Sequence, residues 1–288
     1  MITPSYKTGV VIGLLLAGVL HAGAQERRHK EIPLGDEREL SVVVDVSFGT
    51  VIIGRGPSEK LVVADFSSRW EDQSEDFKIS YKSHGTRGEL IVRSKDRSRF
   101  WGKDNGESED RVWNLQFSDQ IPMDLRVELG AGKGELDLSG LRIQSLKVSS
   151  GASSVELNCD KPNPIVAEEV IIESGVSKFT ARNLANTNFR RLKFSGGVGA
   201  YKLDFSGKLM RDADAKVEVG LGAITIDVPR EMPVQLYYDD TWFSSFDLDD
   251  GFTKRRGGLY ETVGYSSGDP ALSIRIEAGL GSVKIRRR

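Results

Sequence analysis

The sequence predicts an all-β protein with the fold of a single-stranded, β-helix-like β-solenoid. Three observations lead to this expectation: apolar residues alternate with period two, a glycine ends each alternating run, and the whole unit recurs. The glycines at positions 132, 151, 175, 197 and 220 enclose four intervals with a mean of 22 residues. That length holds two short strands and two bends, which is one coil of a solenoid.

Residues 1–24 are typical of a secretory signal peptide. Lys7 is the only charged residue among them, the run Gly9–Leu20 is apolar, and Ala22-Gly23-Ala24 offers a signal peptidase site. The apolar run has twelve residues, whereas a membrane-spanning helix needs about 20. We therefore expect cleavage before Gln25 and export to the periplasm or the cell exterior, with an uncleaved N-terminal anchor as the alternative. After cleavage no transmembrane segment is expected.

The mature chain expected after this cleavage, residues 25–288, has balanced charge and one cysteine. Removing Lys7 leaves 39 basic against 42 acidic side chains, a balance that does not favour nucleic-acid binding. Cys159 is the only cysteine of the chain, so a disulfide within one chain is excluded. It continues the alternating positions Val155 and Leu157. We expect a buried thiol there, in a chain long enough to build a large core without disulfides.

Residues 25–125 are expected to form an irregular β region that opens and caps the solenoid, with a separate small β-domain as the alternative. A looser copy of the repeat lies at Val44–Ile53, and the charged stretch 94–111 is interpreted as a loop. Further strand-like runs lie at 61–63, 77–81, 90–92 and 112–117.

The regular coils are expected over residues 126–228, with a final coil and a basic C-terminus at 272–288. In each coil the inward residues become smaller toward a glycine, and a second alternating strand begins four residues later. We interpret this glycine as the corner of the coil, where it would adopt a positive φ without a Cβ clash. The predicted corner glycines are Gly132, Gly151, Gly175, Gly197, Gly220 and Gly279.

The outward positions of the coils predict two polar columns, with equivalent residues about 4.8 Å apart. The simpler interpretation is a self-neutralising solvated face, and the functional one is a strip that binds an anionic envelope polymer. The first column would hold Glu128, Lys147, Ile171, Lys193, Lys216 and Arg275, and the second Gly130, Ser149, Glu173, Ser195, Glu218 and Glu277.

Residues 229–271 interrupt the repeat with an aromatic and acidic insertion. We expect it to cap the last coil, because an open strand edge promotes aggregation. Its apolar members Trp242, Phe243, Phe246 and Phe252 would cover that coil. The rim left exposed is the expected partner surface, made of Trp242, Asp247, Asp249, Asp250, Lys254, Arg255 and Arg256.

The sequence contains no arrangement typical of an enzyme, so we predict no catalytic residue, no cofactor and no metal. The mature chain has only His29 and His84, too few for a catalytic triad or a histidine–cysteine metal site in the repeats. The glycine-rich run Gly130–Gly134 precedes a strand, whereas a phosphate-binding loop precedes a helix. The acidic run Asp247–Gly251 lacks the spacing and distal glutamate of an EF-hand, which leaves a solvated turn as the simpler interpretation.

Two segments resemble a known family of proteins. Phe252–Tyr260 (FTKRRGGLY) and Ile274–Ile285 (IRIEAGLGSVKI) look like the C-terminal end of the LiaF-like, or toast-rack, family of bacterial envelope proteins, and the upstream coils resemble the related adhesin-type solenoids. The resemblance implies a β-solenoid outside the cytoplasmic membrane and, in the family's best-known branch, envelope-stress signalling through protein contacts. That branch has N-terminal membrane helices where this chain has a signal peptide, so direct control of a sensor kinase is not implied.

The sequence as a whole therefore predicts an exported, non-enzymatic envelope protein of structural or interaction type, linked to envelope stress or to adhesion. Its expected partner is an envelope protein or a cell-surface polymer. A binding module for anionic glycan or lipid head groups is the first alternative, and it should show an exposed aromatic or basic strip. A carbohydrate-active solenoid enzyme that uses clustered carboxylates is the second, and it should show convergent acids of shifted pKa.

Overall fold

The computed structural model describes residues 26–68, 77–94, 111–238, 244–265 and 268–288 of the 288-residue chain. These residues form one 16-stranded sheet, folded so that two walls enclose the core. Within them there is no α-helix, and a single 3₁₀ turn, η4 (Leu184–Thr187), lies between two strands. The predicted β-solenoid fold is confirmed.

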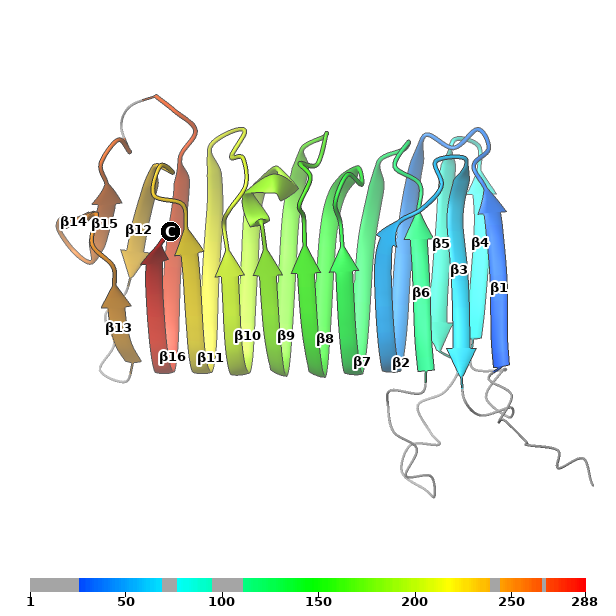
Figure 1. The fold of residues 1–288 in the computed structure, drawn as a ribbon, viewed down its shortest axis with the longest axis horizontal. Coiled ribbons are helices and arrows are strands. Elements are labelled where there is room, and N and C mark those ends of the chain that lie inside the picture. Colours follow the sequence, from blue (N-terminus) through cyan, green and yellow to red (C-terminus); the bar gives the residue numbers. More distant parts are fainter. Residues whose placement is uncertain (1–25, 69–76, 95–110, 239–243, 266–267) are drawn as a thin grey trace, which may run out of the picture.

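Each regular coil is one long strand that bends at its middle, as Figure 1 shows along the lower edge. The first halves of these strands pair in parallel to form the first wall, and the second halves form the second wall. The turns that join successive coils lie along the upper edge. The seven bent strands are β2 (Glu39–Arg55), β7 (Met123–Asp137), β8 (Ile143–Asn158), β9 (Ala167–Arg182), β10 (Phe189–Asp204), β11 (Ala213–Val228) and β16 (Leu272–Arg287).

The apolar alternation fills the space between the walls. One set of register-equivalent residues from neighbouring coils is fully buried: Val44, Val127, Val148, Ile172, Phe194, Val217 and Ile276. Burial of one such side chain stabilises the fold by roughly 1.5–3 kcal/mol, and a lone coil would have no partner to bury it against. Cys159 is buried in the same core, as the alternation predicts, and burial raises the pKa of its thiol to about 12.

The corner glycines are aligned differently from the prediction in the first regular coil. Leu129 pairs with Ser150 and Ala131 with Ala152, so Gly130, not Gly132, is the equivalent of Gly151. The other predicted corners, from Gly151 to Gly279, do align with one another. The error is a shift of two residues, which leaves a period-two alternation unchanged.

The reason for these glycines also differs from the prediction. Positive φ is found at Gly132, Gly222 and Gly281, two residues after the corner column, and not at Gly197 or Gly220. In the corner column it is the neighbouring coil that excludes a side chain. A Cβ on Gly151 would lie 2.3 Å from the carbonyl oxygen of Gly130, and a Cβ on Gly279 would lie 2.4 Å from that of Gly220. Glycine therefore permits a close approach of two backbones there.

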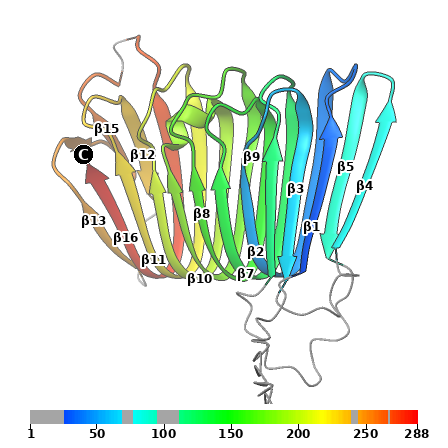
Figure 2. The same ribbon diagram turned by 45° about the vertical axis from the view of Figure 1, so that its right-hand side comes forward.

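At the N-terminal end the two walls continue separately, as Figure 2 shows. On the first wall β2 pairs with β5 (Arg87–Ser94), and β5 pairs with β4 (Phe77–His84). On the second wall β2 pairs with β6 (Arg111–Phe117), followed by β3 (Lys60–Ser68) and β1 (Glu26–Pro33). Trp113 of β6 and Phe66 of β3 are register partners buried in the core, with ring centroids 5.2 Å apart.

At the C-terminal end β16 pairs directly with β11, so the inserted segment lies beyond the last coil and not inside the stack. On the first wall β16 pairs with β12 (Val234–Tyr238), which is followed by β15 (Leu259–Thr262) and β14 (Phe252–Lys254). On the second wall β16 pairs with β13 (Ser244–Leu248). We call β12 to β15 the cap.

Candidate functional site

The aromatic residues of the cap pack against the end of the core. Phe246 of β13 stacks on Tyr238 of β12, with ring centroids 4.1 Å apart, and contacts Tyr260 of β15 at 5.6 Å. Phe252 is half-buried beneath the guanidinium of Arg287, 5.5 Å from its ring centroid. The predicted anchor Trp242 and its neighbour at 243 lie outside the described residues.

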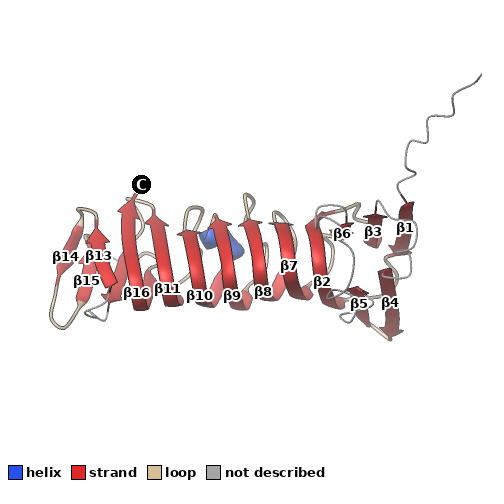
Figure 3. Ribbon diagram, turned by 90° about the horizontal axis from the view of Figure 1, so that it is seen from below, coloured by secondary structure: helices blue, strands red, loops and turns tan. Residues whose placement is uncertain are grey.

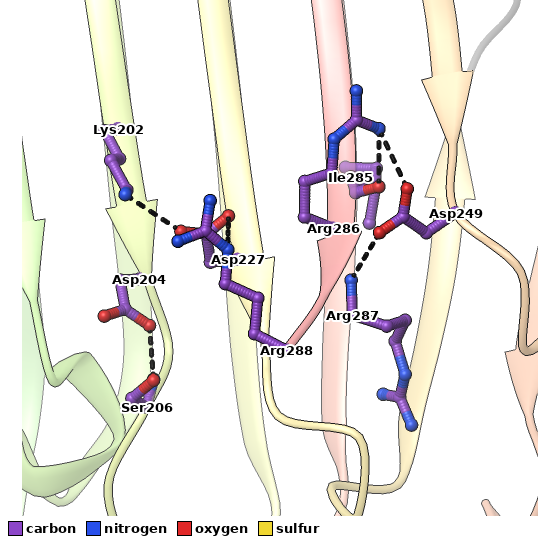
Figure 4. A network of polar contacts seen from close by, with 9 residues as sticks. All are labelled: Lys202, Asp204, Ser206, Asp227, Asp249, Ile285, Arg286, Arg287 and Arg288. Carbon is purple, nitrogen blue, oxygen red and sulfur yellow. Dashed lines mark hydrogen bonds and ion pairs between the residues drawn. The ribbon is translucent and has the colours of Figure 1, made fainter.

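The predicted acidic rim is largely used to attach the cap. The Arg286 guanidinium lies 2.5 Å from Asp247 Oδ2 and 3.2 Å from Asp249 Oδ1, and the Arg287 backbone N–H donates to Asp249 Oδ2 at 3.0 Å. Figure 4 shows the contacts of Asp249 with β16. The Arg286 contact lowers the pKa of Asp247 below its ordinary value. Asp250 is exposed in the turn after β13.

The predicted basic rim is also partly neutralised by the cap itself. The Arg255 Nε–H donates to Glu261 Oε2 at 2.9 Å. The Lys254 ammonium lies 5.7 Å from the ring centroid of Tyr260, a cation–π contact. Arg256 is exposed. The structure therefore places these predicted partner residues together in the cap, but most of them are engaged by other residues of the cap or of β16.

The basic C-terminus is fixed to the stack rather than free. The buried carboxylate of Asp227 lies 3.0 Å from Lys202 Nζ and 3.4 Å from Arg288 Nε (Figure 4). The Arg287 guanidinium donates to the carbonyls of Met232 and Arg230, and its burial lowers its pKa. These contacts join Arg287 to the turn that leads into the cap and Arg288 to β11.

Two charged columns do run along the first wall, with a corrected register. Arg126 aligns with Lys147 and Glu128 with Ser149, so the predicted places of Glu128 and Gly130 were wrong by two residues. Ion pairs join the columns, which gives the self-neutralising face of the simpler interpretation. The pairs are Arg126–Glu128 at 2.5 Å, Lys147–Glu173 at 3.0 Å, Lys193–Glu218 at 3.3 Å, Lys216–Glu218 at 2.6 Å and Lys216–Glu277 at 3.2 Å.

Where the columns approach the cap, the first wall contains a hollow of about 470 Å³, which we call the basic hollow. It holds four cations against two carboxylates. Its polar and aromatic lining is Glu169, Arg191, Lys193, Asp214, Lys216, Gln235, Tyr237, Ser273 and Arg275.

Arg275 and Tyr237 form the distinctive part of the basic hollow. The Arg275 guanidinium lies over the Tyr237 ring, 4.8 Å from its centroid. Lys193 and Lys216 are engaged by Glu218, but Arg275 makes no ion pair with any residue that the structure describes. The repeat in the sequence places Arg275 in a column, but it does not connect this residue with Tyr237.

That contact requires β12 to pair with the first half of β16, which aligns Tyr237 with Arg275. The alternation of Val234, Leu236 and Tyr238 was a usable signal. It turns the residues between them, Gln235 and Tyr237, outward.

In the described ranges no group of three or more His, Cys, Asp or Glu residues is arranged to hold a metal ion. The same ranges contain no helix with the length and apolar character to span a bilayer.

Residues 21–182 match the family model described as the N-terminal domain of toast_rack, DUF2154. The match covers more than half of the chain. The chain belongs to the toast-rack family. No curated protein matches it.

The chain is also similar to solved structures at low sequence identity. One is a proposed cell adhesion protein from Clostridium sporogenes ATCC 15579, which is 19% identical, with a TM-score of 0.48 and coverage of 92% of this chain and 100% of that one. Another is a proposed adhesin from Bacteroides fragilis NCTC 9343, which is 11% identical, with a TM-score of 0.40 and coverage of 91% and 98%.

Proposed function

We propose that this toast-rack protein is an exported, non-enzymatic interaction protein of the bacterial cell envelope, and that its basic hollow binds an anionic envelope polymer. The observation that carries the proposal is the Arg275–Tyr237 pair, a cation without a carboxylate partner in the described chain, stacked on an aromatic ring inside a hollow. Membership of the toast-rack family supports the envelope role.

The chemistry of the hollow suits a sugar acid or a phosphate-bearing polymer. A guanidinium offers a planar fork of donors that binds a carboxylate or phosphate through two hydrogen bonds, and stacking on Tyr237 holds that plane in place. Gln235 and Ser273 add neutral polar groups beside it. A volume of about 470 Å³ is within the usual range for small-molecule sites, and it accommodates one or two units of a chain.

The electrostatics of the acidic groups favour binding over acid catalysis. A general acid in a glycosidase needs a raised pKa. Here Lys147 lowers the pKa of Glu173, Lys216 lowers that of Glu218, and Arg286 lowers that of Asp247. These carboxylates are held as anions, which supports structural roles for them.

The physiological consequence that we propose is adhesion or the reporting of envelope stress, since either role would use a contact with an envelope polymer. A strain that lacks the protein separates the two. Loss of attachment to a polymer-coated surface supports adhesion, whereas a changed response of an envelope-stress reporter supports stress sensing.

The direct test is titration of residues 25–288 with polygalacturonate, with neutral dextran as the control polymer. We expect polygalacturonate alone to bind. Arg275→Ala should weaken binding about tenfold or more because a charge-assisted contact is lost, and Tyr237→Ala should weaken it because the guanidinium is no longer held in place. Arg182→Ala is the matched control, since Arg182 lines a hollow on the second wall and pairs with Glu156 at 2.8 Å. Equal weakening by all three variants, or binding of dextran, would contradict the proposed site.

A further inference from the structure

A row of aliphatic side chains is exposed along the lower edge of the stack, which Figure 3 shows from below as one line of corners from β2 to β16. The row consists of Val176, Val198, Leu221 and Leu280, which are 66%, 46%, 47% and 52% exposed and are register-equivalent residues of β9, β10, β11 and β16. Because neighbouring coils are about 4.8 Å apart, these side chains form a line roughly 14 Å long, which we call the apolar ridge. Single exposed aliphatic residues are ordinary on protein surfaces, but an aligned row of them marks an interaction site.

The fold does not require large exposed residues at these positions. The equivalent residues of β7 and β8 are Ala131 and Ala152, and that of β2 is the half-buried Phe48. The apolar ridge is therefore a property of the last four bent strands and not of the corner itself.

Small and uncharged residues surround most of the apolar ridge. In β10, β11 and β16 the five residues centred on the ridge are Gly196–Ala200 (GGVGA), Val219–Ala223 (VGLGA) and Ala278–Ser282 (AGLGS). Ser282 carries the only polar side chain in these three segments. A protein partner is usually bound through a polar rim with several direct hydrogen bonds, whereas a lipid surface needs only apolar area.

The backbone of the apolar ridge is paired between coils. Val198 aligns with Leu221, and Leu221 with Leu280, in the parallel ladders of β10, β11 and β16. Backbone groups that are paired within the protein can approach hydrocarbon at little cost, whereas unpaired groups cannot. The corners therefore combine exposed aliphatic side chains with a backbone that suits an apolar environment.

The nearest acidic column is neutralised by its own lysines. Glu218 and Glu277 lie three residues before Leu221 and Leu280, and Lys216 Nζ is 2.6 Å from the Glu218 carboxylate and 3.2 Å from that of Glu277. This flank of the ridge has little net charge, so it neither requires nor strongly repels an anionic lipid.

The chain enters the stack at the same lower edge. Glu26, the first residue of β1, pairs with Ser68, and Ser68 pairs with Arg111, where β6 begins beside the corner of β2. The predicted export signal, residues 1–24, ends one residue before Gln25 joins β1. Under the proposed export, the lower edge is thus the edge that is attached to the membrane until the signal is cleaved.

We propose that the apolar ridge docks on the surface of a phospholipid bilayer, with the axis of the stack parallel to the membrane and the valine and leucine side chains among the lipid head groups. The inference uses the proposed envelope location but not the polymer site, and the basic hollow on the first wall stays open in this orientation. Interfacial binding strengthens with the apolar area that is buried, and four partly exposed aliphatic side chains offer a small area. We therefore expect reversible binding that is measurable at millimolar lipid.

The direct test is flotation of residues 25–288 with phosphatidylcholine vesicles at low and at high salt. The bound fraction should rise with lipid concentration and be similar at both salt concentrations, because ions do not screen an apolar contact. Leu221→Glu should weaken binding about tenfold or more, since it places a charge in the ridge. Met210→Glu is the matched control and should bind like the native protein, because Met210 is also 47% exposed but lies between β10 and β11 at the upper edge. Leu221→Glu should keep the native denaturant midpoint, because that side chain is already half exposed.

Lengthening the ridge should strengthen binding. Ala152 is exposed at the corner of β8 and aligns with Val176, so Ala152→Leu extends the row by one coil and should strengthen binding about threefold or more. The orientation is measured with an environment-sensitive fluorophore on Val198→Cys, whose emission should shift to the blue on vesicles, whereas the same fluorophore on Met210→Cys should not respond. The native Cys159 is buried and is not labelled.

Absence of flotation for both the native protein and Ala152→Leu, or equal losses in Leu221→Glu and Met210→Glu, would overturn the membrane contact. Binding to phosphatidylglycerol vesicles alone that disappears at high salt would assign it to surface charges instead of the ridge. Self-association without lipid that Leu221→Glu abolishes would assign the ridge to a second copy of the chain. Arg275→Ala should float normally, so a failure of the membrane contact is distinguishable from a failure of the polymer site.

Discussion

At the N-terminal end of the stack Trp113 of β6 is fully buried in the core, with the Phe66 ring of the neighbouring strand β3 packed against it. At the C-terminal end Phe246 is only half-buried, and β13 is held in addition by the Arg286 contacts with Asp247 and Asp249. The N-terminal end is closed by large, fully buried side chains, whereas the C-terminal end is closed by partly buried rings and by ion pairs. The regions with less buried apolar area open first in a native protein, so the cap should be the less stable end.

The largest expected effect is that of Trp113→Ala. Removing a fully buried indole should lower the free energy of unfolding by about 3–5 kcal/mol, measured as a shift of the denaturant midpoint. Trp113→Phe is the matched control and should cost much less, because the indole N–H has no hydrogen-bond partner to lose. Equal losses for the two variants would show that volume does not stabilise this end.

Phe246→Ala should have a smaller and local effect. The ring is half-buried and stacked on Tyr238, so the loss should be about 1–3 kcal/mol. Hydrogen exchange should accelerate in β13 and β15 but not in β8 or β9. Val263→Ala, at an exposed position, should leave both unchanged. Faster exchange along the whole stack would contradict a separately opening cap.

The two ends should also respond to pH in opposite directions. At the C-terminal end Arg286 lowers the pKa of Asp247. The contribution of Asp247 to the stability of the cap is therefore present above the unfolded-state pKa and is lost as the pH falls through the folded-state pKa. We expect the protection of the β13 amides against hydrogen exchange, relative to the intrinsic rate at each pH, to fall in acid. Asp247→Asn should remove most of that pH dependence. An unchanged acid response in the variant would assign the effect to other carboxylates.

The smallest effect is expected at β1. The His29 ring lies 2.8 Å from Asp65 Oδ1, and this contact raises the pKa of the histidine above 6.5. The contribution of this His29–Asp65 contact to stability is therefore complete below the unfolded-state pKa of the histidine and is lost as the pH rises through the folded-state pKa. Protease cleavage near β1 should become slightly faster above neutral pH in the native protein but not in His29→Gln. Glu31 on the same strand has a lowered pKa and responds only in acid.

The sequence was sufficient for the fold because the coil repeat combines alternation and glycine at a regular spacing. It was not sufficient for the register of the first coils, because a shift of two residues leaves the inward face unchanged. A glycine in the sequence also does not show whether the position needs a positive φ or permits the close approach of two backbones. Gly222 shows the first and Gly197 the second, and both appear in the sequence as the same Gly-x-Gly corner.

The basic hollow required the three-dimensional pairing of strands. Tyr237 and Arg275 are brought together by the pairing of β12 with β16 across the inserted segment. The exposed apolar residues at the lower edge were closer to prediction, because they occupy the middle of the Gly-x-Gly/Ser corner, where Val176 and Leu221 follow Ala131 and Ala152 of earlier coils. The middle residue of a tight corner points outward, so its growth from alanine to leucine could have been noticed.

The two edges of the stack differ in how much length they tolerate. Along the lower edge each bent strand crosses at the same register, whereas the upper connections from β7 to β11 vary between five and eight residues, and the cap lies between β11 and β16. In this part of the stack the length variation lies on the upper rim, as expected for turns, which are outside the backbone contacts between coils. A foreign peptide grafted between Asp204 and Ala213 would be displayed on that rim, and several grafts in successive coils would form an array with a spacing of about 4.8 Å per coil.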